Sequence, residues 1–292
     1  MVLQKGTWPQ RKRSSMAGRP HRANIRLLPD GFSGIGVKIL VLFYGLIRRF
    51  VFDKSKFTAL TMTKEECLIC KAPLEYLETD ELMECEICHK KEYSKTRCIN
   101  GHYVCNDCHT AGIDAIIGLC LTETSKNPVE IIEKMMAMPF CHMHGPEHHV
   151  MVGSALLTAY KNAGGDIDLH SALLEMIHRG KSVPGGACGF WGACGAGVSS
   201  GMFLSIISKS TPLAQEPFGL ANRMTAKSLD EIGKIGGPRC CKRDSFLSLL
   251  SAIDFVKEHF GVEMDRPEII CKYSSQNNQC IGKRCPFSPK IR

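Results

Sequence analysis

Three C-x2-C pairs between residues 67 and 108 constrain this chain more than any other feature of its sequence. A C-x2-C pair in a tight turn directs both sulfurs toward one zinc ion at about 2.3 Å, so each pair supplies half of a tetrahedral site. A cysteine and a histidine, separated by three residues, add a fourth half-site. The eight ligands suffice for two zinc ions: Cys67, Cys70, Cys85, Cys88, Cys98, His102, Cys105 and Cys108.

The spacing leaves two pairings open. Sequential pairing, as in a zinc ribbon, joins the first two C-x2-C pairs on one ion. An interleaved cross-brace instead joins Cys67 and Cys70 with the Cys98–His102 half-site, and joins the other two pairs with each other. Either way the eight ligands close both sites, so we expect structural zinc that supplies much of the folding free energy of a module with little core. His89 and His109 follow ligand cysteines and are spare candidates.

The expected architecture is a small zinc-bound α+β module, ribbon or cross-brace, at 62–110, followed by a mainly α-helical domain at 111–292. Apolar residues at helical spacing predict helices in the second part, and no segment there alternates as a strand does. Asn127 is a plausible cap for the first helix, and Gly164 with Gly165 a plausible end for the second. The predicted helices cover 128–138, 146–163, 168–178, 192–208, 221–235 and 244–260.

Residues 1–61 differ in composition from the rest of the chain. They contain 12 Lys/Arg and 2 Asp/Glu, a net charge of +10, and none of the 16 cysteines. We interpret them as a disordered leader, or as sequence upstream of a native start at Met62. A signal peptide and a weak membrane contact through Ile39–Phe57 are the alternatives, and the apolar run Val37–Ile47 is too short for a transmembrane helix.

The remaining residues, 62–292, carry a net charge of only −2. A nearly neutral body has no overall electrostatic reason to bind nucleic acid. Without a credible export signal we expect a cytoplasmic protein, in which thiols stay reduced. Such cysteines are then available for metal ligation or for redox chemistry.

A second cysteine site is expected after residue 187. Cys240 and Cys241 are adjacent and flanked by cations, which should lower thiol pKa values and favour a catalytic role or a strained vicinal disulfide. The other cysteines would bind a cofactor, and a proline after the last of them is typical of iron–sulfur ligand sets. A third zinc is the alternative. These cofactor candidates are Cys188, Cys194, Cys271, Cys280 and Cys285.

Two further motifs bear on this site. The glycines of "VPGGACGFWGACGAGVSSG" would let backbone N–H groups approach a cofactor or, alternatively, let two helices pack closely. In "CHMHGPEHHV", His148 and His149 lie on different helix faces and cannot both chelate one metal. One of them, for which we take His148, would serve the cysteine site as a catalytic proton donor.

Two resemblances add context. "CINGHYVCNDCH" resembles the second half of a RING finger of the seven-in-absentia type, which implies a ubiquitin-ligase role as a third option. The motifs "MHGPEHHV", "GGACGFWGACGA", "GGPRCCKRDSF" and "QCIGKRCPF" resemble a family of unknown function from methanogens and anaerobic bacteria. Some of its members are fused to an S-adenosylmethionine-dependent methyltransferase domain, whose glycine-rich loop is missing here.

These observations favour a metalloprotein with structural zinc and a second, iron–sulfur cysteine site for redox or sulfur-transfer chemistry, which acts with a redox or protein partner. The alternative is a non-enzymatic zinc-binding adaptor for a protein partner. RNA is a weaker choice of partner for the adaptor because the body of the chain is nearly neutral.

Overall fold

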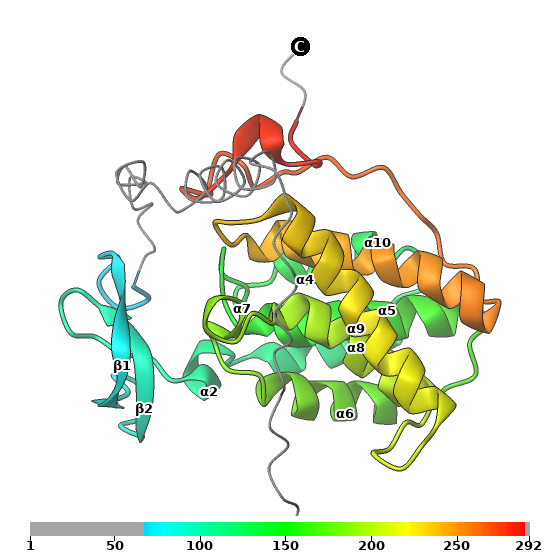
Figure 1. The fold of residues 1–292 in the computed structure, drawn as a ribbon, viewed down its shortest axis with the longest axis horizontal. Coiled ribbons are helices and arrows are strands. Elements are labelled where there is room, and N and C mark those ends of the chain that lie inside the picture. Colours follow the sequence, from blue (N-terminus) through cyan, green and yellow to red (C-terminus); the bar gives the residue numbers. More distant parts are fainter. Residues whose placement is uncertain (1–66, 290–292) are drawn as a thin grey trace, which may run out of the picture. The chain divides into compact units, whose positions relative to one another are not determined.

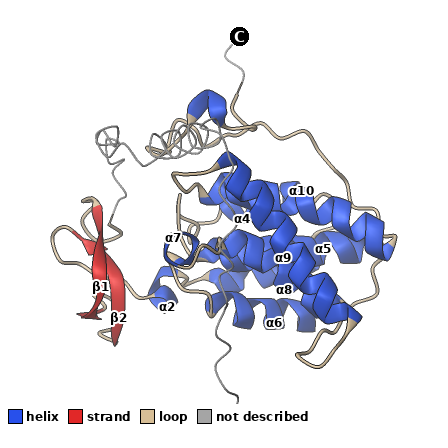
Figure 2. Cartoon of the chain, viewed as in Figure 1, coloured by secondary structure: helices blue, strands red, loops and turns tan. Residues whose placement is uncertain are grey.

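The computed structural model describes residues 67–289. This part begins with a two-stranded module and continues into a helical domain (Figures 1 and 2). The leader expected at 1–61, with its apolar run, lies outside the described residues. None of the helices between residues 67 and 289 combines the length and apolar character that a membrane crossing requires.

The module is an antiparallel hairpin of β1 (Leu74–Glu84) and β2 (Lys91–Cys98) followed by the short helix α2 (Asn106–His109). An irregularity between Tyr76 and Glu81 shifts the register of the two strands. The hydrophobic cluster of the module is small and has four buried members: Met83, Cys85, Tyr103 and Cys105. So small a core gives the module little hydrophobic stabilisation of its own.

The helical domain is built around α5 (Glu147–Asn162), which is buried along most of its length. The residues that flank it explain its bounds, because Pro146 fits a first turn and Gly164 adopts a positive φ just after its end. It packs against α3 (Ile116–Thr122), α4 (Pro128–Met136), α6 (Leu169–Lys181), α8 (Gly195–Ile207) and α10 (Cys241–Phe260). The remaining helical elements are η2 (Ile113–Ala115), α7 (Ala187–Phe190), α9 (Glu216–Ile235) and η3 (Gly282–Arg284).

The mainly helical second part is confirmed, and no strand occurs among its described residues. The Asn127 side chain accepts from the backbone N–H groups of Val129 and Glu130, so it caps α4 as expected. The predicted helix 192–208 begins later, at Gly195, after a separate turn. Helix α9 begins five residues before the predicted start, because Pro217 in its first turn is compatible with a helix.

The glycines of α8 make a close helix–helix contact. A Cβ on Gly201 would collide with Thr225 of α9, and one on Gly197 would press on Leu229 of the same helix. In the helical half of the glycine-rich motif, the small residues therefore allow α8 and α9 to pack closely. The loop half, before Gly195, lines a cavity described below.

Candidate metal centres and thiol site

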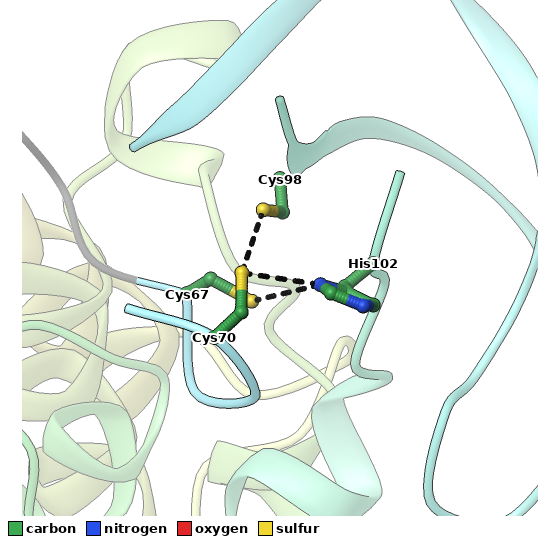
Figure 3. Close-up of side chains that lie close together, drawn as sticks. All are labelled: Cys67, Cys70, Cys98 and His102. Carbon is green, nitrogen blue, oxygen red and sulfur yellow. Dashed lines mark hydrogen bonds between the residues drawn. The ribbon is translucent and has the colours of Figure 1, made fainter. Parts of the chain in front are cut away.

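The first candidate metal centre is formed by Cys67, Cys70, Cys98 and His102, whose ligand atoms all lie within 4.8 Å of one another. Figure 3 shows them converging from the turn before β1, the end of β2 and the loop after it. The sulfurs of Cys70 and Cys98 are 3.4 Å apart, and His102 Nδ1 lies 3.2 Å from Cys70 Sγ and 3.9 Å from Cys67 Sγ.

The second candidate centre is formed by Cys85, Cys88, Cys105 and Cys108, again with all sulfurs within 4.8 Å. The first two lie in the turn between β1 and β2, and the others at the start of α2. The sulfurs of Cys88 and Cys105 are 3.6 Å apart. Cys85 and Cys105 are fully buried, whereas Cys88 is exposed, as Cys70 is in the first centre.

The turns explain why the pairs converge. The residue after each of the first two C-x2-C pairs, Lys71 and His89, has a positive φ, which curls the chain back around the sulfurs. Backbone N–H groups then point at the sulfurs, as from Ile69 to Cys67 at 3.4 Å and from Cys108 to Cys105 at 3.5 Å. Such donors stabilise thiolates, the form in which cysteine binds a metal.

Both sets have the dimensions of a tetrahedral zinc site. Zn–S bonds of about 2.3 Å place two tetrahedral sulfurs about 3.8 Å apart, close to the separations described above. In each set one thiol already has a lowered pKa. The backbone of Ala72 is the main cause that lowers the pKa of Cys70 to about 6. Burial raises the pKa of Cys85, but hydrogen bonds from the backbone of Cys105 and Cys88 outweigh it and lower that pKa to about 6.

The structure brings together the interleaved sets and not the sequential ones. The spare histidines belong to neither set. His89 lies 3.2 Å from Glu84 on the exposed side of the hairpin. The ring of His109 instead faces Glu147 of the helical domain, with 3.3 Å between Nδ1 and Oε2.

A cavity of about 730 Å³ is lined by residues of the module and of the helical domain. The loop before α8 and the start of α10 contribute thiols to its wall, and the start of α5 contributes histidines. A second cavity of about 680 Å³ is more apolar and shares Cys188 and Cys194 with the first. Its wall also includes Arg239, Arg243 and several glycines.

The seven cysteines of the expected second site fall into two neighbourhoods. Cys194 Sγ lies 3.8 Å from Asp244 Oδ2 beside the cavity. Cys240 Sγ accepts from Asn277 Nδ2 at 3.3 Å, which ties it to the C-terminal loop with Cys271, Cys280 and Cys285. Within residues 67–289, no group of three or more ligand residues with all ligand atoms within 4.8 Å of one another includes any of these seven, so the iron–sulfur site stays a prediction. All of the cysteines are free thiols, and Cys240 and Cys241 form no vicinal disulfide.

The expectation of low thiol pKa values at Cys240 and Cys241 is wrong. Burial raises the pKa of Cys240 and raises that of Cys241 well above its ordinary value. The neighbouring arginines lower these two pKa values by less than burial raises them, and two of the three flanking cations also have other partners. Arg243 donates to Asp244 at 2.9 Å, and Lys242 turns away from the two cysteines toward α5.

The target of Lys242 is Cys141, a residue that the sequence patterns did not single out. Lys242 Nζ lies 3.0 Å from Cys141 Sγ, and His148 Nε2 lies 3.9 Å from the same sulfur. Burial raises the pKa of Cys141, but the Lys242 ammonium and the hydrogen bonds around the sulfur outweigh it and hold that pKa below the ordinary value. A lone cysteine before "HMHGPEHHV" gave no spacing signal, and its lysine comes from 101 residues further along the chain.

His148 and His149 diverge, as expected from their places on a helix. His148 faces Cys141, whereas His149 Nδ1 lies 3.1 Å from the carbonyl oxygen of Val183 beside the cavity. Burial lowers the pKa of His149 to about 4, which keeps this ring neutral at physiological pH.

Comparison with known proteins gives one match. A model described as a family of unknown function (DUF5714) matches residues 116–288, which is the helical domain without the module. No curated protein and no solved structure matches the chain.

Proposed function

The chain belongs to this family of unknown function, and we propose that it is a metalloprotein that is stabilised by zinc and carries out redox or sulfur-transfer chemistry. The single observation that carries the first half is the pair of closed four-ligand sets in the module. Thiolate and imidazole donors at tetrahedral separations suit zinc, and four protein ligands leave no open position for catalysis. The zinc ions are therefore assigned a structural role.

Metal analysis of the purified full-length chain tests this proposal, with two zinc ions per chain as the expected result. His102→Gln and Cys88→Ser should each lower the content to about one ion or less, because each leaves a three-ligand set. His89→Gln is the matched control, since this histidine also follows a cysteine but its ring faces Glu84 and belongs to neither ligand set. An unchanged zinc content in His102→Gln, or a loss in His89→Gln, would contradict the ligand sets.

The second half rests on the thiols of the helical domain and on the cavity that several of them line. An iron–sulfur cluster held by Cys188, Cys194, Cys271, Cys280 and Cys285 is the form of this site that the sequence motifs favour. Anaerobic purification with iron analysis and visible absorption spectroscopy tests it. Zinc alone, without a visible chromophore, would exclude the cluster.

Exposed apolar residues of the module favour an adaptor as a second candidate. Ile69, Ile87 and Ile99 each lie within or directly after a ligand turn and are 44%, 54% and 55% exposed. Exposed aliphatic side chains around a rigid metal site suit a protein partner better than RNA. A pull-down from the native lysate distinguishes the candidates: retention of a partner by Cys240→Ser and Cys241→Ser, with loss in Ile69→Ser, would favour the adaptor.

A further inference from the structure

A buried lysine forms the centre of a polar cluster in the helical domain. Lys242, near the start of α10, is 2% exposed. Its ammonium nitrogen lies 3.0 Å from Cys141 Sγ, 2.9 Å from the carbonyl oxygen of His142 and 3.1 Å from His148 Nε2. The ring of Tyr273 covers it from another side, 5.2 Å away. Three acceptors for three N–H groups satisfy a charged ammonium completely.

The hydrogen-bond pattern assigns the protons of the cluster. His148 Nδ1 lies 3.1 Å from the carbonyl oxygen of Gly145, which can only accept, so Nδ1 carries the hydrogen. Nε2 then presents its lone pair to Lys242. The lysine must donate to this nitrogen and to the His142 carbonyl, and its third hydrogen points to Cys141. A thiolate is the form of Cys141 that best accepts this bond and balances the buried charge.

A metal ion is the competing occupant, because donor atoms of Cys141, Glu147 and His148 lie within 4.8 Å of one another. The ammonium argues against it. An ion bound at about 2.0–2.3 Å from the sulfur and from Nε2 would lie within roughly 3.5 Å of the ammonium, so two positive charges would face each other with no ligand between them. The Lys242 ammonium already supplies the positive charge that a metal ion would bring to Cys141.

We propose that Cys141 is a nucleophilic thiolate that accepts sulfane sulfur from an anionic donor of the thiosulfate or persulfide class. This inference rests on the sulfur-transfer form of the proposed function and assigns the sulfur-accepting role to Cys141. The thiolate attacks the outer sulfur of thiosulfate, a new S–S bond forms at Cys141, and the S–S bond of the donor breaks. Sulfite leaves with the electron pair of that bond, so the step needs neither a proton nor an oxidant.

The surroundings of Cys141 suit this step. Lys242 stabilises the attacking thiolate and then the persulfide anion that replaces it, because the charge of the persulfide lies on the added sulfur, only about 2 Å from Sγ. Cys141 is not fully buried, unlike the lysine and the histidine beside it. Cys120 provides a contrast within the same domain. It is fully buried, none of the described lysines contacts it, and burial raises its pKa to about 11.

The test uses the anaerobically purified full-length chain and thiosulfate. Peptide mass spectrometry should find one additional sulfur atom on Cys141 and none on Cys120. In parallel, the rate of alkylation of Cys141 by iodoacetamide as a function of pH reports its thiolate. In Lys242→Met the midpoint of this profile should rise by at least about one pH unit, and persulfide formation at neutral pH should fall several-fold.

Two controls keep the result interpretable. Lys234→Met removes an exposed lysine that pairs only with Asp230 and Glu231, and it should leave both readouts unchanged. If Lys242→Met does not fold, the pH profile of the unaltered chain still decides, because an alkylation midpoint at or above that of a free thiol overturns the thiolate. No added sulfur on Cys141, or sulfur on Cys240 or Cys241 instead, overturns the transfer step.

Metal content separates this inference from the proposed function. A third zinc per chain that disappears in Cys141→Ser would show that a metal ion, and not Lys242 alone, balances the thiolate, and it would overturn this inference. The two zinc sites of the module would be unaffected. Absence of zinc from the module refutes the structural-zinc half of the proposal and leaves the Cys141 result standing. Sulfur transfer to Cys141 with two zinc ions per chain supports both.

Discussion

Replacing Gly201 by alanine should destabilise the helical domain, although alanine is the better helix former. Gly201 lies in α8, and a Cβ there would collide with Thr225 Oγ1 and lie 3.1 Å from the carbonyl oxygen of Ala221. The threonine side chain can rotate, at the expense of its own bond to that carbonyl, which is 3.2 Å long. The backbone oxygen can only retreat if α8 and α9 separate.

The size of the effect follows from these opposing terms. Overpacking costs about 1–3 kcal/mol, and loss of the threonine hydrogen bond costs about 1 kcal/mol. The higher helix propensity of alanine offsets at most about 1 kcal/mol of this loss in the free energy of unfolding. We therefore expect a net loss of about 1–3 kcal/mol in the free energy of unfolding, or roughly 2–4 °C in Tm for each kcal/mol.

Denaturant unfolding of the zinc-loaded chain measures this loss of stability. Far-UV circular dichroism follows the unfolding of the helices. Gly219→Ala is the matched control, because it lies in α9 and its Cβ would meet nothing within 4 Å. That variant should be unchanged or more stable by up to about 1 kcal/mol. A Gly201→Ala variant as stable as Gly219→Ala would refute the view that these glycines serve close helix packing.

Three other predictions concern stability. Asn127→Ala should cost about 1 kcal/mol in urea unfolding, because the cap of α4 is lost, whereas Asn127→Asp should retain most of it. Arg243→Met should cost about 3–5 kcal/mol because it leaves the buried carboxylate of Asp244 without its partner, and adding Asp244→Asn should recover part of the loss. The pKa of His149 is about 4 in the folded chain and about 6.5 in the unfolded chain, so the unfolded state binds the extra proton between these values. Stability should thus fall as pH decreases from about 6.5 to about 4, by up to about 3 kcal/mol, and His149→Gln should flatten this part of the curve; equal slopes in both proteins would show that other groups cause it.

The elements that could be predicted from the sequence are those determined by local signals. The cap at Asn127 and the glycines after α5 mark helix ends by rules that involve only neighbouring residues. The eight ligands of the module could be counted for the same reason, since a C-x2-C turn is local. Which half-sites share an ion depends on how the hairpin folds back, and spacing alone leaves that open.

Contacts between distant segments could not be predicted. Nothing near Cys141 in the sequence indicates a cation, because Lys242 reaches it from α10. The cations beside Cys240 and Cys241 gave the opposite error: adjacency along the chain suggested low pKa values, but burial dominates there and the side chains point to other partners. A cysteine's environment is set by its three-dimensional neighbours, which is why Cys141 was missed and the pKa values of Cys240 and Cys241 were predicted wrongly.

The interleaving of the two ligand sets also bears on how the module is made. Sequential sets would let the first be complete when residue 88 has left the ribosome. The observed sets are complete only at His102 and Cys108, six residues apart and near the end of the module. Until then the emerging chain carries only half-sites, so both centres should assemble almost at once, after the hairpin between them has formed.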